Sequence, residues 1–214
     1  MLVDPFRDLT ADDAAPWLER RLREFFDRRA QAEGRAVFMH KFTGWPRARL
    51  LAKVFPEAKF VHVLRDGRSV ANSYVQVRFW QGYRGVPGWA FGDLSSQERQ
   101  DWKAANYSWP YLAGLEWKRL MTAFEACKDE IGPERWLDLR YEELVGRPAE
   151  KTTAVLRFTG LDRWSGLEQR LAALRVSEGR TDAYRDELRP DDVALLEVAL
   201  AATLERWGYS VSGN

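Results

Sequence analysis

Arg65 and Ser73, two side chains suited to holding a phosphate, lie close to a turn between an apolar run and a helical pattern. Ligands of open parallel sheets bind at the carboxyl ends of strands, where helix N-termini present free N–H groups to anions. The run Phe60–Leu64 ends at Arg65, whose guanidinium geometry suits a phosphate, and Ser73 adds a hydroxyl one turn beyond Ser69. The spacing predicts a phosphate site here, and a purely local pairing of Arg65 with Asp66 is the alternative that the pattern leaves open.

The elements around this turn predict an α/β fold with a parallel sheet flanked by helices. The apolar run at 36–39 and the almost continuously apolar run at 59–64 are typical of strands buried on both faces, and residues 135–139 are predicted to form a third strand. Strands separated by a helix form a βαβ unit, which crosses over right-handed. Helical patterns cover 11–32, 46–55, 67–77, 97–130 (interrupted at Pro110), 148–159, 164–173 and 191–207. No repeat or linker interrupts the chain, so residues 1–214 are predicted to form a single domain.

Composition excludes several classes of protein. Lys and Arg number 33 against 32 Asp and Glu, and the net charge of +1 gives no field that would attract nucleic acid. Cys127 is the only cysteine and there are two histidines, so neither an internal disulfide nor a Cys/His metal centre is expected. No apolar run reaches the roughly 20 residues of a membrane span, and the first residues lack a signal-peptide pattern. We therefore expect a cytoplasmic protein with no integral membrane segment and no metal.

Four segments in one order resemble the sulfotransferases that use 3′-phosphoadenosine 5′-phosphosulfate (PAPS), whose fold is related to P-loop kinases. Residues 55–68 (FPEAKFVHVLRDGR), followed by Ser73, resemble their nucleotide 3′-phosphate-binding motif. Residues 139–144 resemble a strand-end segment whose tyrosine lies by the adenine, and residues 177–190 resemble the stretch that closes over the nucleotide. Lys41 matches the lysine after the preceding strand. The resemblance covers residues 35–210 and is closest to a bacterial branch of the family.

The resemblance implies a role for each matching residue. Arg65 and Ser73 would hold the 3′-phosphate, and Arg180 with Arg185 would add charge to that site. Tyr141 would lie along the adenine. Each of these also has an ordinary structural alternative, such as a solvated arginine or a tyrosine packed under a strand end. The five predicted nucleotide-binding residues are Arg65, Ser73, Tyr141, Gly179 and Arg180.

The predicted catalytic residues are Lys41 and His40. The resemblance implies that Lys41 binds a sulfate oxygen. The family's cytosolic branch has a histidine two residues after this lysine, but here that position is Thr43, which cannot act as a base. His40 is adjacent to Lys41 and histidine is a common general base, yet strand alternation points it away from Lys41. Glu98, Asp101 and a carboxylate outside the sequence remain alternative bases.

An aromatic-rich excursion over residues 78–117 is the predicted acceptor side. Indole rings form either core or flat-faced binding surfaces, and Trp109 and Trp117 are expected to be core because they lie within a helical pattern. Aromatic faces suit sugars, phenols or lipids. The predicted acceptor-binding residues are Trp80, Tyr83, Trp89, Phe91 and Trp102.

One part of the family pattern is absent. No Gly-rich loop for the phosphosulfate precedes Arg65, and Gly44-Trp45-Pro46 cannot replace it because Pro46 lacks the N–H that a phosphate cradle needs. We therefore expect an N-terminally incomplete sulfotransferase fold. Its exposed sheet edge would be covered by a missing N-terminal segment or by a second copy of the chain.

The resemblance thus implies transfer of a sulfuryl group from PAPS to a hydroxyl or amine of a small-molecule, glycan or lipid acceptor. The missing loop leaves a non-catalytic relative, which binds a nucleotide or a partner chain but transfers nothing, as the alternative. A nucleoside or shikimate-type kinase of the same broad fold would carry a Walker-type Lys-Ser/Thr loop, which this sequence lacks.

Overall fold

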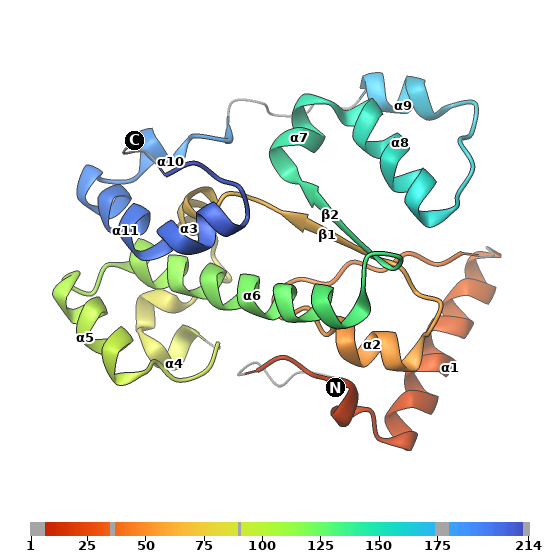
Figure 1. Ribbon diagram of the computed structural model, residues 1–214, viewed down its shortest axis with the longest axis horizontal. Coiled ribbons are helices and arrows are strands. Elements are labelled where there is room, and N and C mark those ends of the chain that lie inside the picture. Colours follow the sequence, from red (N-terminus) through yellow and green to blue (C-terminus); the bar gives the residue numbers. More distant parts are fainter. Residues whose placement is uncertain (1–6, 35–36, 90, 174–179, 212–214) are drawn as a thin grey trace. The chain divides into compact units, whose positions relative to one another are not determined.

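A computed structural model describes residues 7–34, 37–89, 91–173 and 180–211 of the chain (Figure 1). The chain forms two compact units. The first comprises residues 1–60 and 122–136, and the second comprises residues 61–121 and 137–214. The prediction of a single domain stays a prediction.

The first unit contains the 3-10 turn η1 (Ala11–Asp13) and the helices α1 (Pro16–Glu33) and α2 (Ala48–Val54). The predicted helix over 11–32 therefore starts later than expected. Asp13 accepts a hydrogen bond from the Thr10 backbone N–H at 2.8 Å, which closes a separate turn ahead of Pro16. Proline lacks an N–H and is favoured at the first position of a helix, so α1 begins there.

The strand predicted over 36–39 is wrong for its described residues, 37–39, which form no strand. Val37 and Met39 are 58% and 91% exposed, whereas Phe38 and His40 pack against Phe26 of α1 at 5.5 and 5.6 Å between ring centres. The segment alternates as an extended chain does, but one side faces solvent and no described strand pairs with it. An apolar run alone cannot distinguish this arrangement from a buried strand.

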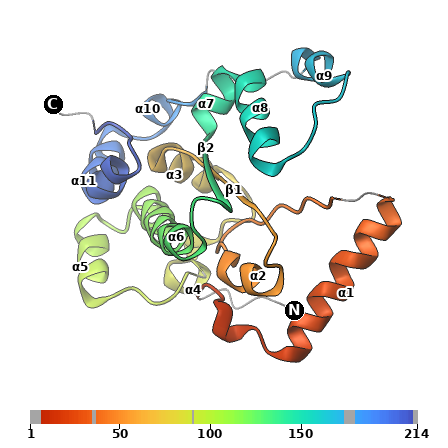
Figure 2. The same cartoon turned by 45° about the vertical axis from the view of Figure 1, so that its right-hand side comes forward.

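The sheet contains β1 (Phe60–Leu64) and β2 (Trp136–Arg140), whose first residues belong to the first unit and whose others belong to the second. Figure 1 shows the two strands side by side and running in the same direction. α3 (Gly67–Gln76) follows β1 directly and packs against α11 (Pro190–Arg206), as both views show (Figures 1 and 2). The predicted α/β class, a parallel sheet flanked by helices, is confirmed.

The aromatic stretch of the second unit is more helical than expected. It contains η2 (Gly82–Arg84), α4 (Val86–Trp89), α5 (Ser96–Ala104) and the first part of α6 (Trp109–Ile131). The break in the predicted long helix precedes Pro110, which takes the second position of α6, where a missing N–H is tolerated. One cluster of this unit's core comprises Trp89, Leu94, Ala105, Tyr111, Leu112 and Leu115.

The remaining helices follow β2. α8 (Pro148–Thr159) and α11 occur close to the predicted ranges, and α9 (Leu167–Ala173) begins slightly later than predicted. α11 buries Leu196, Leu200 and Leu204 on one face. None of the described helices is both long and apolar enough to cross a membrane. The other bounds are α7 (Tyr141–Gly146) and α10 (Tyr184–Glu187).

Candidate functional site

Arg65 follows β1 and carries a guanidinium with unused donor capacity. Its Nη2 donates to the backbone carbonyl of Arg180 at 2.6 Å, and its Cζ lies 4.8 Å from the centre of the Tyr141 ring. Its Nε is buried without a hydrogen-bond partner, and no acidic side chain within the described ranges forms an ion pair with Arg65. A buried N–H group without an acceptor is costly, so this guanidinium is suited to an anion.

The sequence left open a local pairing of Arg65 with Asp66. In the structure Asp66 pairs with Arg68 instead. Asp66 caps α3 by accepting the Arg68 backbone N–H at 2.8 Å. The Arg68 side chain is 4% exposed, binds both carboxylate oxygens of Asp66 at 3.1 and 2.7 Å, and reaches Glu197 at 3.0 Å. The Asp66 N–H donates to Glu142 at 3.0 Å. Because two N–H groups at this helix start already bind carboxylates, side chains must supply most of the attraction for a phosphate.

The structure brings together three of the five predicted nucleotide residues, Arg65, Tyr141 and Arg180. The Arg180 side chain is 52% exposed, and its Nη2 donates to Glu187 at 3.1 Å. Ser73 is half-buried on α3, and its hydroxyl has no hydrogen bond to another described residue. Gly179 lies outside the described residues.

The predicted catalytic residues Lys41 and His40 both belong to the first unit. Lys41 is exposed in the extended segment that replaces the predicted strand. The His40 ring lies 4.5 Å from the ring of Phe42 and also contacts Phe26, so its position is set by aromatic packing. The roles of both residues in catalysis stay predictions.

Two of the predicted acceptor-binding tryptophans are buried. Trp89 is 3% exposed, and Trp80 is 7% exposed and donates its Nε1–H to Glu116 at 3.0 Å. Burial raises the pKa of Glu116 to about 8, although hydrogen bonds from Trp80 and Tyr74 lower it. This buried carboxyl is a residue that the sequence analysis missed, because one glutamate within a helical pattern carries no sign of burial.

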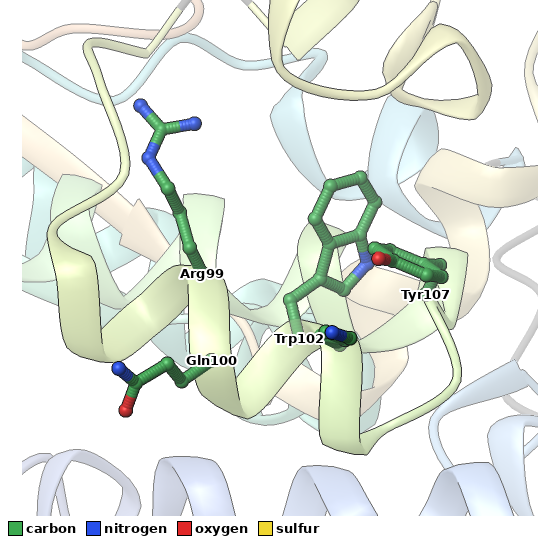
Figure 3. Close-up of a pocket in the computed structure, with 5 residues that line it drawn as sticks. Arg99, Gln100, Trp102 and Tyr107 are labelled. Carbon is green, nitrogen blue, oxygen red and sulfur yellow. The ribbon is translucent and has the colours of Figure 1, made fainter.

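The other predicted acceptor residues are more accessible. Tyr83 is 47% exposed, and Phe91 is half-buried. Trp102 lines a surface hollow of about 320 Å³ on α5, with its ring edge-on to Tyr107 at 5.1 Å (Figure 3). Of the two tryptophans expected in the core, Trp117 is buried at 4% exposure, whereas Trp109 is 52% exposed because it starts its helix. The hollow is lined by Arg99, Gln100, Trp102, Lys103 and Tyr107.

A polar face of α3 is a second feature that the sequence analysis missed. The Ser69 hydroxyl donates to the Thr181 carbonyl, and Asn72 and Gln76 donate to the Glu187 carboxylate at 2.7 and 2.8 Å. The spacing of these donors along the helix places them on one face, which is the signal that could have revealed them. No group of three or more His, Cys, Asp or Glu side chains that could hold a metal occurs in the part of the chain described.

Comparisons with known proteins agree with this architecture. The chain is 23% identical over 171 residues to the omega-hydroxy-beta-dihydromenaquinone-9 sulfotransferase Stf3 of Mycobacterium bovis, and to the same degree to that of Mycobacterium tuberculosis. These alignments cover 76% of this chain but 38% of each relative, so the chain spans well under half of their length.

A solved structure, the sulfotransferase domain from the curacin biosynthetic pathway, matches with a TM-score of 0.50 at 16% identity, over 77% of this chain and 59% of that one. This likeness confirms the predicted sulfotransferase-type fold. A model described as the sulfotransferase family matches residues 7–166, which is more than half of the 214 residues. With this match extending from the first unit through the Arg65 turn to β2 and beyond, the chain belongs to the sulfotransferase family.

Proposed function

We propose that this chain binds the adenosine 3′-phosphate group of PAPS at the start of α3 and takes part in sulfuryl transfer to a hydroxyl or amine. The observation that carries the proposal is the Arg65 guanidinium, which has a buried Nε without a hydrogen-bond partner among the described residues and lies beside Tyr141 and the Arg180 backbone. An anion would satisfy that N–H group.

In this proposal each residue has a separate task. Arg65 and the Ser73 hydroxyl bind the 3′-phosphate, and Arg180 adds a second positive charge beside it. Tyr141 lies next to Arg65 and provides a ring edge for the adenine. The co-substrate supplies the sulfuryl group. Because these residues hold a phosphate away from the reacting sulfur, their loss should weaken nucleotide binding more than it alters the chemical step.

The acceptor that we propose is an apolar molecule with a hydroxyl group, such as a lipid. The name of the mycobacterial relatives states that they act on a hydroxylated menaquinone. The exposed Tyr83 and the half-buried Trp102, which lines the surface hollow, are compatible with an apolar acceptor, although they are equally compatible with sugars. Lys41 keeps its proposed role of binding a sulfate oxygen.

Calorimetric titration with adenosine 3′,5′-bisphosphate tests the nucleotide part of the proposal. We expect wild type to bind and Arg65→Ala to lose about tenfold or more in affinity, since hydrogen bonds to charged groups contribute about 1.5–3 kcal/mol. Arg78→Ala is the matched control, because Arg78 is exposed just beyond α3 and has no described partner. Equal affinities of wild type and Arg65→Ala would remove the basis of the proposal.

Transfer is tested separately, by incubating the chain with PAPS and a hydroxylated isoprenoid quinone and measuring the sulfated product. Formation of a sulfated product supports the proposal that this chain catalyses sulfuryl transfer. Arg65-dependent binding without any product, from this acceptor or from phenol and sugar acceptors, supports the alternative of a non-catalytic nucleotide-binding relative.

A further inference from the structure

Residues 180–187, which we call the strap, are held by four polar side chains that lie along and just before α3. Arg65 binds the Arg180 carbonyl, and Ser69 binds the carbonyl of the following residue, Thr181. Asn72 and Gln76 bind the side chain at the other end, Glu187. The positions 65, 69, 72 and 76 are spaced by three or four residues, so the strap is fastened along one side of the helix that follows β1.

The Glu187 carboxylate joins the end of the strap to α3. Its Oε2 accepts hydrogen bonds from Asn72 at 2.7 Å, Gln76 at 2.8 Å and Arg180 at 3.1 Å. Hydrogen bonds from Gln76 and Asn72, with that from Arg180, keep the pKa of Glu187 below its usual range. The Glu187 side chain is 34% exposed, so it can be replaced without opening the core.

The same contacts fix Arg180 at two places. Its backbone carbonyl is bound by Arg65, and its guanidinium is bound by Glu187. A guanidinium has five N–H donors, so the bond through Nη2 leaves others for a phosphate oxygen. Loss of the Glu187 carboxylate would release both the end of the strap and the Arg180 side chain, although Glu187 itself need not touch a nucleotide.

We propose that Glu187 is a positioning residue that sets the preference of this site for nucleotides carrying a 3′-phosphate. The inference rests on the proposed nucleotide site and adds to it the residue that holds Arg180 and the strap in place. In this proposal the Glu187 carboxylate assists 3′-phosphate binding because it holds Arg180 in position. It does not compete with the phosphate for that side chain.

The test compares affinities for adenosine 3′,5′-bisphosphate and adenosine 5′-monophosphate. Only the bisphosphate carries a 3′-phosphate. A loosened Arg180 should therefore weaken binding of the bisphosphate and leave binding of the monophosphate unchanged. We expect Glu187→Ala to lower the ratio of the two affinities by about tenfold, the size expected when a charged hydrogen bond is lost. Asp186→Ala, which removes the same charge from the neighbouring exposed residue, should keep the wild-type ratio.

A second measurement needs no nucleotide. Amide hydrogen exchange over residues 181–187 should be faster in Glu187→Ala and in Asn72→Ala than in wild type, because the strap loses its anchor. Unchanged exchange would overturn the anchoring role. An unchanged affinity ratio in Glu187→Ala, with Arg65→Ala still impaired, would overturn this inference alone. Equal affinities of wild type for the two nucleotides would overturn the proposed function and the inference with it.

Discussion

Arg65 and Arg68 are three residues apart but have different surroundings. Arg68 is 4% exposed, and its charge is balanced by Asp66 and Glu197. Arg65 has a backbone carbonyl and an aromatic ring as its neighbours, and its buried Nε–H has no acceptor in the part of the chain that the structure describes. Charge already balanced inside the protein stabilises the fold, whereas charge left unbalanced is available for a ligand. The difference gives Arg68 a structural task and agrees with the binding task that we propose for Arg65.

The buried carboxyl of Glu116 should make the free energy of unfolding depend on pH. Burial raises its pKa from an ordinary 4.5 to about 8, so the folded protein keeps a proton that the unfolded chain releases. The free energy of unfolding should therefore fall as pH rises between these values, by at most about 1.4 kcal/mol per pH unit from this group. Glu116→Gln keeps the size of the side chain and abolishes the titration, so its stability relative to wild type should rise from pH 5 to pH 8.

Urea unfolding at pH 5, 6, 7 and 8 measures this difference, and subtraction of the two curves removes the contribution of all other groups. Glu205→Gln, at an exposed position near the end of α11, is the control and should parallel wild type. Parallel curves for Glu116→Gln and wild type would show that Glu116 is ionised in the folded protein, contrary to this account.

At the scale of elements, the close packing of α6 on the start of α3 holds Arg65 in place. Trp117 is 4% exposed and donates its Nε1–H to the Arg65 carbonyl at 3.1 Å. A Cβ added to Gly67 would lie 2.5 Å from Cε3 of that indole. The glycine that begins α3 is therefore required by this contact between helices.

Gly67→Ala should destabilise the protein by about 1–3 kcal/mol, the usual cost of inserting a methyl group into a packed site. Gly146→Ala is the matched control, because nothing lies within 4 Å of its added Cβ and alanine is favoured over glycine in a helix. Chemical denaturation distinguishes the two variants. Equal stability of Gly67→Ala and wild type would mean that Trp117 can move away from this contact.

Local sequence pattern predicted the elements that carry the proposed nucleotide site, and it failed where a contact with a distant part of the chain decides the structure. The apolar run before Arg65 and the helical spacing after Gly67 gave β1 and α3 close to their observed bounds. The run at 36–39 looked similar, yet its described residues pair with no strand in the structure. Strand formation depends on a neighbour elsewhere in the chain, which periodicity does not contain.

At the scale of the whole chain, motif order was more informative than any one motif. Arg65, Tyr141 and Arg180 are far apart in sequence, and their proximity could be expected only from the resemblance. The anchoring role that we propose for Glu187 could not be predicted from the sequence, because its hydrogen bonds with Asn72 and Gln76 depend on how the strap lies against α3. The burial of Trp80 was not expected for a similar reason, since its partner Glu116 lies 36 residues away.

The central claim is that the turn after β1 holds the 3′-phosphate of an adenosine nucleotide. A crystal structure of the protein with adenosine 3′,5′-bisphosphate tests it most directly. The account predicts that oxygens of the 3′-phosphate lie within hydrogen-bond distance of the Arg65 guanidinium and the Ser73 hydroxyl, with the adenine beside Tyr141. A nucleotide bound elsewhere, with Arg65 still attached only to the Arg180 carbonyl, would contradict it.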